Sequence, residues 1–446
     1  MESRLDPFYH QSYFRELENQ LKGSKHKLVK LKDICTAVRG VTYSRDDEAE
    51  EGVKILRANN ITLSTNEINL DDVRYIRADF PVSDEQKLKT GDILMSAASG
   101  SKEHVGKVAY IADGTDFYFG SFMMVLRADT SKVNPQYLFE FLASKIFRNL
   151  LFRILGGTNI NNLNFSMIGD FDIPLPPHEI QSKIAKISEK NRIKAKELEE
   201  EARSMIASID DYVLGELGIA TERERERERV SDAAQIWQIW SDVIERRLDP
   251  MYFHPERMRA IESIKKSNLP ISPLSEVVNF RRDLVGEIPE NLPYVGLENI
   301  VSNSGEYVET GEKESVSSAF VFKKGDVLFP KLRPYLNKVF YADFDGVCST
   351  EFHVLEAQKC SPFFLFSFLS RSVVVEQTSR LMTGNTLPRL QTDDVKELLV
   401  PIPEEEKQEK ITSGVRNYYE EMRNLREEAT KSLSGAQAQV EQMILA

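Results

Sequence analysis

Residues 4–9 read Arg-Leu-Asp-Pro-Phe-Tyr, and residues 247–252 read Arg-Leu-Asp-Pro-Met-Tyr. A second motif is also duplicated, because Pro174-Leu175-Pro176 returns as Pro401-Ile402-Pro403. One repeat of more than 200 residues predicts two diverged copies of a domain and not a solenoid of short repeats. The spacing between copies shrinks from 243 residues at the first motif to 227 at the second. We therefore expect one scaffold with altered loops, which suits two different binding surfaces.

The composition is that of an ordinary globular protein. The chain has 446 residues, of which 41% are hydrophobic and 29% charged, and this length accommodates two or three domains. Cys35, Cys348 and Cys360 lack the pairing of a disulfide framework and the spacing of a zinc site. The N-terminal stretch is charged, which argues against a signal peptide, and no apolar run is long enough for a membrane span. We expect a cytoplasmic protein.

The motifs divide the chain into four segments. We expect a first module at 1–177, a long helix at 178–245 with a charged linker at 221–230, a second module at 246–403 and another long helix at 404–446. The fold class is α+β, with two tandem homologous mixed α/β modules separated by long helices. After each Pro-x-Pro motif, apolar residues follow coiled-coil spacing. The seam residues expected are Ile180, Ile184, Ile187, Leu198, Ala202, Met205, Ile209 and Tyr212 in the first helix, with Asn191 and Lys194 as polar members, and Ile411, Val415, Tyr418, Met422, Leu425 and Ala429 in the second.

Within the modules, alternating apolar residues between Gly, Asn and Asp turns predict strands, and proline at a first helical turn predicts helices. The expected strands are Val53–Arg57, Ile93–Met95, Lys107–Ile111 and Met123–Leu126, and the expected helices are Ser12–Leu21, Pro135–Leu142, His254–Lys265 and Pro362–Leu369.

No catalytic motif supports an enzyme. The chain has no P-loop, no His-Glu-x-x-His and no Gly-x-Ser-x-Gly sequence. Asn134-Pro135-Gln136-Tyr137 is superficially similar to the loop with which amino-methyltransferases hold a flipped base. The equivalent Ser361-Pro362-Phe363-Phe364 could not perform that chemistry. The histidines lack metal-ligand spacing, so we expect neither catalysis nor a metal site.

Several loops are rich in side chains that hydrogen-bond to planar edges. Residues 331–338 combine cations with Asn and Tyr, a mixture suited to phosphate contact and base reading, although a solvated hairpin turn has the same composition. Residues 156–162 match 384–389; Asn can pair with adenine and Arg with guanine, while an Asn that caps the next helix is the structural alternative. The candidate binding residues are Arg39, Thr42, Tyr43, Ser44, Lys102, His104, Lys107, Thr158, Asn159, Asn161 and Asn162 in the first module, and Arg281, Arg282, Lys331, Arg333, Tyr335, Asn337, Lys338, Asn385, Thr386 and Arg389 in the second.

The formal net charge of −12 argues against a protein that binds nucleic acid unaided. Either DNA is not the ligand, or a partner subunit supplies much of the affinity for phosphates. The alternating Glu and Arg of 221–229 cancel each other's field and indicate a solvated linker or helix extension. Residues 233–244, with Trp237 and Trp240, have no counterpart before Arg4 and indicate packing on the second module or a partner contact.

Taken together, the chain resembles the specificity subunit of type I restriction-modification systems, the HsdS family, over essentially its full length. The motifs that carry the resemblance are the two module openings at Arg4 and Arg247, Gly91-Asp92-Ile93-Leu94 with Gly325-Asp326-Val327-Leu328, Lys331-Leu332-Arg333-Pro334-Tyr335, and the closing sequences 173–181 and 400–408. Each motif alone is weak, whereas their duplicated order is fairly specific.

The resemblance implies two target-recognition domains, each reading one half of a bipartite DNA site, and two long helices paired as an antiparallel coiled-coil spacer. It implies a chain that performs no chemistry and binds no cofactor. The expected partners are double-stranded DNA, methyltransferase subunits that use S-adenosylmethionine, and a restriction subunit that these can recruit. Because the candidate loops differ between the copies, we expect an asymmetric target. The methyltransferase subunits would supply cationic surface.

Two alternatives remain open. The charged run at 221–229 and the insertion around Trp237 depart from the family pattern, which allows a Type IIB-like complex or another methylation-based phage-defence system. A protein adaptor with duplicated modules and a coiled coil for dimerisation is the other alternative, and the sequence pI of about 5.3 favours it slightly.

Overall fold

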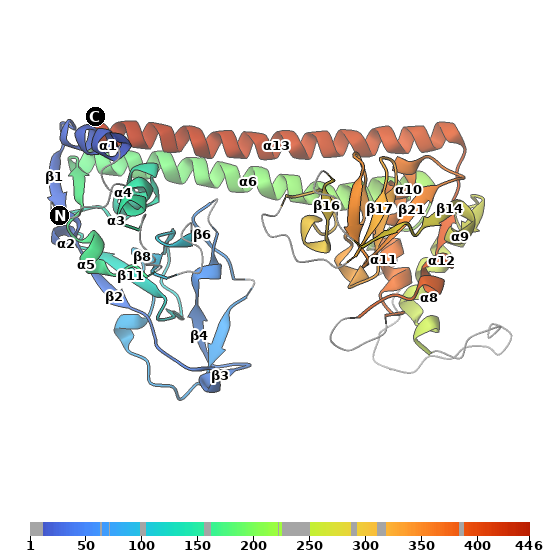
Figure 1. The fold of residues 1–446 in the computed structure, drawn as a ribbon, viewed down its shortest axis with the longest axis horizontal. Coiled ribbons are helices and arrows are strands. Elements are labelled where there is room, and N and C mark those ends of the chain that lie inside the picture. Colours follow the sequence, from blue (N-terminus) through green and yellow to red (C-terminus); the bar gives the residue numbers. More distant parts are fainter. Residues whose placement is uncertain are drawn as a thin grey trace. The chain divides into compact units, whose positions relative to one another are not determined.

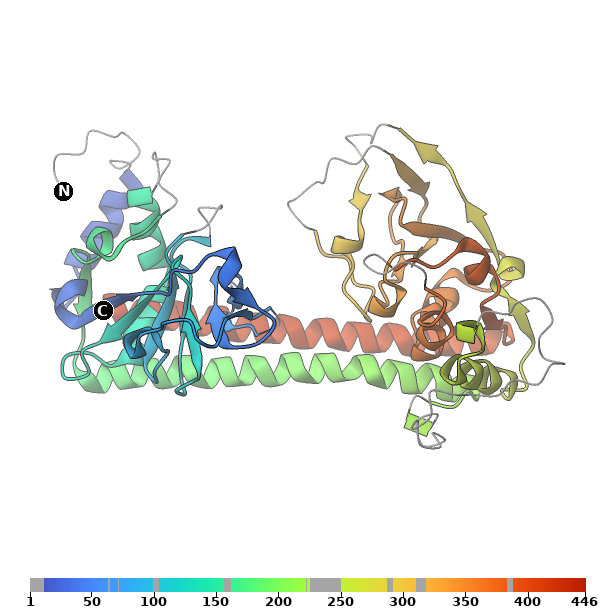
Figure 2. The ribbon, with the colours of Figure 1, turned by 90° about the horizontal axis from the view of Figure 1, so that it is seen from below.

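The computed structural model describes residues 12–62, 65–70, 72–98, 104–155, 162–221, 223–224, 250–286, 292–309, 318–382 and 388–446. The chain forms two compact units (Figures 1 and 2). Unit 1 contains Met1–Leu198 and Glu427–Ala446, and unit 2 contains Glu199–Arg426. Each unit therefore holds one module and a part of both long helices. The motif at 4–9, the start of its copy at 247–249, most of the charged linker and the insertion at 233–244 lie outside the described residues.

Unit 1 is built around a four-stranded antiparallel sheet. Its strand order is β2 (Cys35–Arg39), β11 (Met123–Ala128), β8 (Asp92–Ser96) and β9 (Val108–Tyr110). A second sheet has the order β10 (Phe117–Phe119), β4 (Val53–Leu56), β7 (Arg74–Ile76) and β3 (Glu48–Ala49), with β10 and β4 parallel. The predicted strands are confirmed to within about a residue at most ends.

The first sheet is covered on both faces, which explains why every residue of β8 is buried. Along the strands the side chains alternate: Ile93 and Leu126 join the core beneath the helices, whereas Leu94 and Val125 join the core against the second sheet. The helices are α1 (Ser12–Lys22), α3 (Pro135–Ala143), α4 (Lys145–Leu155) and α5 (Phe165–Ile168), and β1 (Lys27–Lys30) pairs with β12 (Asp172–Leu175).

Unit 2 repeats this architecture. One sheet has the order β14 (Val278–Arg281), β21 (Phe352–Ala357), β18 (Val327–Pro330) and β19 (Phe340–Tyr341). The other has the order β15 (Leu284–Val285), β17 (Ala319–Phe322), β20 (Gly346–Ser349) and β16 (Tyr294–Val295), and its parallel pair β16–β20 matches β4–β10. The helices are α8 (Pro255–Lys265), α10 (Pro362–Leu369), α11 (Ser372–Thr378) and α12 (Thr392–Lys396), and β13 (Ile271–Pro273) pairs with β22 (Leu399–Pro401). The predicted duplication is confirmed.

The closing motifs have the same structural task in both units. Gln181 accepts a hydrogen bond from the backbone N of Asn134 (2.8 Å) and donates one to the carbonyl of Pro176 (2.8 Å). Gln408 does the same with Ser361 (2.8 Å) and with the carbonyl of Pro403 (2.9 Å). Each glutamine thus joins the start of a long helix to the start of the helix that follows the sheet. Asn134, which begins the methyltransferase-like sequence, caps α3 by accepting from the N atoms of the second and third helical residues.

The long helices are α6 (His178–Leu217) and α13 (Glu405–Leu445), and they pair antiparallel (Figures 1 and 2). In unit 1, Asn191 Oδ1 accepts from Ser432 Oγ (2.9 Å). In unit 2, the Tyr212 hydroxyl donates to the carbonyl of Lys410 (3.1 Å), and the Tyr212 and Tyr418 rings lie 5.8 Å apart. The expected antiparallel pair is confirmed.

The predicted register of α6 needs one correction. Lys194 was expected in the seam, but its side chain is 51% exposed and pairs with Glu428 (2.7 Å). The next residue, Ala195, is buried instead, with 6% of its surface exposed. Small side chains let the helices approach closely, whereas a lysine ammonium retains its hydration at the flank.

Candidate functional site

In unit 1, four segments that are far apart in the sequence meet at one end of the β2–β11–β8–β9 sheet. Register brings Arg39 opposite Met124, and Met123 opposite Ser96. The backbone N atoms of Ala97 and Ala98 donate to the carbonyl of Phe122 (2.8 and 3.1 Å). Ala98 in turn forms a β-bridge with Asn162. We call Arg39, Thr42, Ala97–Ala98, Phe122 and Asn162 the first loop edge.

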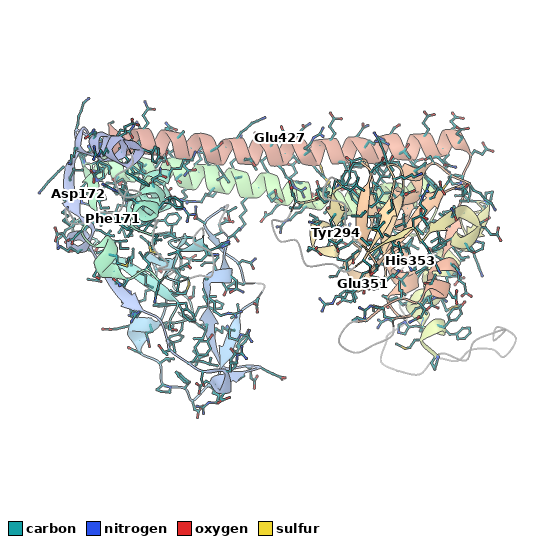
Figure 3. All side chains as sticks on the ribbon, viewed as in Figure 1. Phe171, Asp172, Tyr294, Glu351, His353 and Glu427 are labelled. Carbon is teal, nitrogen blue, oxygen red and sulfur yellow. The ribbon has the colours of Figure 1, made fainter. Side chains whose placement is uncertain are left out.

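Unit 2 carries the same backbone arrangement. Lys331 N donates to the carbonyl of Glu351 (2.7 Å), and Leu332 forms a β-bridge with Arg389. Glu351, which is labelled in Figure 3, directly precedes the first residue of β21. Phe122 directly precedes the first residue of β11 in the same way. The equivalent pairs are therefore Phe122 with Glu351, Asn162 with Arg389 and Arg39 with Arg282. We call Arg282, Lys331–Tyr335, Glu351 and Arg389 the second loop edge.

The structure brings together much of the predicted site. Exposed side chains on the two edges belong to the predicted Arg39, Thr42, Asn162, Arg282, Arg333, Tyr335 and Arg389, and His104 is also exposed. The predicted Lys102, Thr158, Asn159, Asn161, Asn385 and Thr386 lie outside the described residues.

Two predicted lysines are structural. Lys107 is only 5% exposed, and its Nζ donates to the carbonyl of Ile61 (2.8 Å). Its equivalent Lys338 donates to the carbonyl of Leu297 (2.8 Å). Desolvation lowers the pKa of both amines. Each lysine ties a loop to its module, which corrects the prediction that these two side chains bind DNA.

Two further predictions in the second module are corrected. Arg281 pairs with Asp326 (3.2 Å) and with Glu356, leaving its side chain 17% exposed. In unit 1 the equivalent Asp92 is held by Arg127 (2.9 Å), so the cation has moved to a neighbouring strand. Asn337 is 5% exposed and has a φ of 48° where Gly106 has 79°, and its side chain donates to the carbonyl of Ser370 (2.9 Å). Asn tolerates this left-handed conformation better than most residues.

Three predicted residues, of which Lys331 belongs to the second loop edge and Tyr43 and Ser44 follow Thr42 of the first, have local contacts of their own. Ser44 N and Oγ donate to Asp47 Oδ2 (2.8 and 2.7 Å), and these hydrogen bonds lower the pKa of Asp47. Tyr43 packs against a small apolar cluster, and burial raises its pKa. Lys331 Nζ donates to the carbonyl of Thr350 (2.7 Å) and lies 5.0 Å from the centre of the Phe320 ring. Desolvation lowers its pKa.

Sequence reasoning missed Phe122 and Glu351. Phe122 is 68% exposed at a turn of the first loop edge. Glu351 binds the guanidinium of Arg389 in a bidentate ion pair, with Nε–Oε2 and Nη2–Oε1 distances of 3.0 and 2.8 Å. These hydrogen bonds raise the pKa of Arg389. An alignment of the two copies at the starts of β11 and β21 would have shown that Phe122 and Glu351 are equivalent and that one is aromatic and the other acidic.

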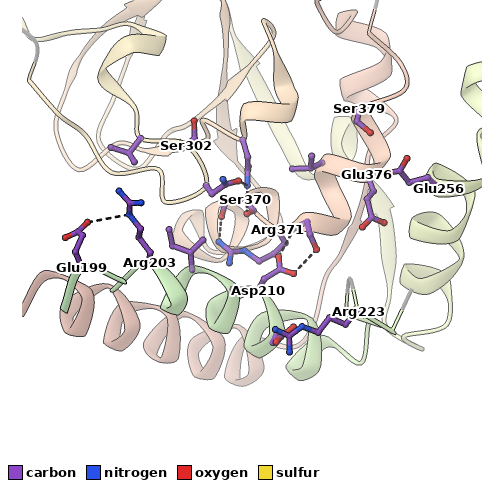
Figure 4. Close-up of a pocket in the computed structure, with 18 of the residues that line it drawn as sticks. Glu199, Arg203, Asp210, Arg223, Glu256, Ser302, Ser370, Arg371, Glu376 and Ser379 are labelled. Carbon is purple, nitrogen blue, oxygen red and sulfur yellow. Dashed lines mark hydrogen bonds and ion pairs between the residues drawn. The ribbon is translucent and has the colours of Figure 1, made fainter. Parts of the chain in front are cut away.

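A pocket of about 820 Å³ in unit 2 lies beside α6 (Figure 4). Its lining contains no residue of the second loop edge. Arg371 is 1% exposed within its lining, and its Nη2 donates to Ser370 Oγ (2.7 Å). In unit 1 the residue equivalent to Arg371 is Ser144, whose Oγ accepts from the N of Phe147 and caps α4. Asp210 of α6 accepts from N and Oγ of the next residue, Ser372 (both 2.7 Å). This pocket thus contains the attachment of α11 to α6.

Two kinds of feature are absent from the described residues. They contain no group of three or more His, Cys, Asp or Glu placed to hold a metal ion. Among them, every helix is too short or too polar to cross a bilayer.

Known proteins are similar to this chain. The family model described as "Type I restriction modification DNA specificity domain" matches residues 24–203 and 282–431. The specificity subunit of type I restriction enzyme StySPI from Salmonella potsdam is 31% identical over 156 residues, 34% of this chain and 33% of that protein. The EcoKI specificity subunit of Escherichia coli K12 is 30% identical over 156 residues, with the same coverage. Each match thus spans about a third of the relative's length. A solved S subunit of a type I restriction-modification system from M. genitalium is 14% identical, covers 94% of this chain and 96% of its own, and has a TM-score of 0.41.

Proposed function

We propose, because this chain belongs to the family of type I restriction-modification DNA specificity domains, that it is the subunit that directs a DNA adenine methyltransferase to a bipartite site. Each module would read one half of the site through its loop edge. The two halves would be unlike, so the recognised sequence would be asymmetric.

One observation supports this proposal above all: the two loop edges share one backbone arrangement but carry different side chains. Both loop edges join the turn before β11 or β21 to the loop after β8 or β18 through an equivalent backbone hydrogen bond, from Ala97 N to the carbonyl of Phe122 and from Lys331 N to the carbonyl of Glu351. On that shared frame, Asn162 of one edge is replaced by Arg389 in the other. Because Asn favours adenine and Arg favours guanine in the major groove, this difference is expected of readers of different bases.

An arginine shared by the two edges supports phosphate contact. Arg39 and Arg282 occupy equivalent strand ends, and both side chains are exposed. Contacts to phosphate carry no sequence information but fix the register of a protein on the duplex. The same residue type at this position in two modules of otherwise different edges suits that shared task.

The partners follow from the charge balance and from the family. With a formal net charge of −12, the chain needs cationic surface from another subunit to hold a DNA duplex. We propose methyltransferase subunits as that source, with S-adenosylmethionine bound by them, and a restriction subunit as a further component of the complex. The chain itself would supply specificity and no catalytic group.

A binding selection tests this proposal. The full chain, purified with its methyltransferase partner, is incubated with a library of random duplexes, and the bound DNA is sequenced. We expect a bipartite motif with two unlike halves. Asn162→Ala and Arg389→Ala should each relax the preference in one half only, and not in the same half. Enrichment of a palindrome would contradict the asymmetric site, and no enrichment at all would indicate the protein adaptor.

A further inference from the structure

We infer that the turn position occupied by Phe122 in the first module and by Glu351 in the second determines base preference in each half-site. Phe122 would contact a thymine methyl group directly. Glu351 would act as a positioning residue that orients Arg389 toward guanine. This inference rests on the proposed function and adds to it two residues whose roles are distinct.

The backbone around Phe122 is fixed while its side chain is free of the core. Its carbonyl accepts from Ala97 N and Ala98 N, and Met123 N donates to the carbonyl of Gly120 (2.8 Å) to close the turn. Met123, the next residue, is 1% exposed, whereas Phe122 is 68% exposed. The turn therefore presents a large apolar ring at a defined place on the first loop edge.

The neighbours of Phe122 indicate what the ring would meet. Asn162 lies across the Ala98 bridge, and the exposed Arg39 ends the adjacent pair of strands. Asn162 offers an amide for a base edge, Arg39 a cation for a phosphate, and Phe122 an apolar ring at the start of β11. Together these groups suit binding in the major groove. There the thymine C5-methyl is the apolar group that distinguishes bases, and aromatic side chains contact it.

At the same position in unit 2, the side chain is an acid. A carboxylate on a DNA-facing edge repels phosphate, so its presence calls for a compensating role. Glu351 is 28% exposed and binds Arg389 through Nε and Nη2, along one edge of the guanidinium. A guanine contact would use the donors of Nη1 and Nη2 at the other edge. Holding the planar guanidinium in one orientation favours bidentate recognition of guanine O6 and N7.

Thymine-to-uracil substitution tests the role of Phe122. The half-site motif is first obtained with the unaltered complex, and each thymine in it is then replaced by uracil, which lacks the methyl group. We expect the unaltered complex to lose affinity about fourfold at one thymine, the value of roughly one buried methylene. Phe122→Ala should show no such loss at that position, and Phe122→Leu, which keeps an apolar side chain, should retain most of it.

Glu351 is tested in the same selection. Glu351→Ala and Glu351→Gln should relax the preference for guanine at one position of the other half-site about tenfold, roughly half of what a good bidentate pair provides. Both variants should leave the half-site read by the first module unchanged. Because Glu351 and Phe122 are not core side chains, thermal unfolding of the variants serves as the folding control.

The outcomes separate this inference from the proposed function. If the unaltered complex enriches no motif, the proposed function itself fails. If it enriches a motif but uracil binds as well as thymine, or Phe122→Ala leaves the thymine effect intact, the role of Phe122 is overturned. An unchanged guanine preference in Glu351→Ala would likewise overturn the role of Glu351.

Discussion

Asp210 of α6 accepts hydrogen bonds from both N and Oγ of Ser372, each 2.7 Å long, and so caps α11 from outside the module. Unit 1 has an equivalent contact, because Glu441 of α13 accepts from the backbone N of Lys145 at the start of α4 (2.7 Å). Each module is thus attached to a different long helix through a helix cap. The long helices are therefore part of each folded unit, and residues of both helices belong to its hydrophobic core.

Removal of the Asp210 cap is predicted to destabilise unit 2. Asp210→Ala should lower the free energy of unfolding by about 1–2 kcal/mol, since two donors of α11 lose their acceptor. Denaturation in urea measures the change. The neighbouring Asp211, which is exposed, provides the control, and Asp211→Ala should change stability by less than about 0.5 kcal/mol. Equal effects of the two variants would refute the cap.

Gln408→Ala should be more damaging than the loss of an ordinary polar side chain from a helix. The substitution removes the acceptor of Ser361 N and the donor to the carbonyl of Pro403. Loss of these buried partners is expected to cost about 1–3 kcal/mol in the free energy of unfolding. Gln439, exposed on the same helix, is the matched control. A Gln408→Ala variant as stable as Gln439→Ala would show that the closing motif does not join helix and module.

The stability of unit 2 should depend on pH through His353. Burial, with smaller effects from Lys331 and Arg282, lowers its pKa from 6.5 to about 3. Because the folded-state pKa is depressed, the stabilising contribution is complete above pH 6.5 and is lost as pH falls toward 3. His353→Met places there the residue found at the equivalent Met124 of the first module.

Urea unfolding at pH 7.5 and pH 5 measures this effect. Between these two pH values the unaltered protein should lose about 2 kcal/mol more stability than His353→Met. The reason is that a histidine in the unfolded chain becomes protonated over this range, whereas the buried His353 does not. The first module has Met124 at the equivalent position, so its unfolding should lack this pH effect and serves as the internal control. An equal loss in both proteins would contradict the buried neutral histidine.

The salt dependence of DNA affinity should change when an exposed arginine is removed, but not when a buried lysine is removed. Arg39→Ala should reduce the slope of log affinity against log salt by about 0.9, the amount expected for one lost phosphate contact. Lys107→Met should leave that slope unchanged, because its ammonium binds the carbonyl of Ile61 and not DNA. The measurement is a titration of the methyltransferase complex with target duplex at several salt concentrations. A reduced slope in Lys107→Met would show that Lys107 does contact DNA.

The sequence predicted the architecture well because each motif occurs twice. Two copies of the Gly-Asp-Ile/Val-Leu strand and of the Pro-x-Pro closing motif indicated the same element independently. Antiparallel pairing then brings loops such as 97–98 and 162 together. Burial of single polar residues could not be predicted in this way. Lys107 and Lys338 follow turns just as exposed lysines do, and only the folded loops at Ile61 and Leu297 provide their acceptors.

The sequence also could not predict which arginine would bind the buried aspartate in each module. Arg281 resembles the exposed Arg282 that follows it, yet it holds Asp326 as Arg127 of another strand holds Asp92. The shift of the α6 seam from Lys194 to Ala195 has a similar origin, since alanine carries little hydrophobic signal but allows close helix packing. Phe122 and Glu351 were missed because neither belongs to a motif.

The most direct test of the central claim is a map of methylated adenines in a host that expresses this chain with its methyltransferase partner. We expect a bipartite motif with unlike halves, of which one half degenerates in Asn162→Ala and the other in Arg389→Ala. Methylation that is independent of this chain, or a palindromic motif in which both variants damage the same half, would contradict it.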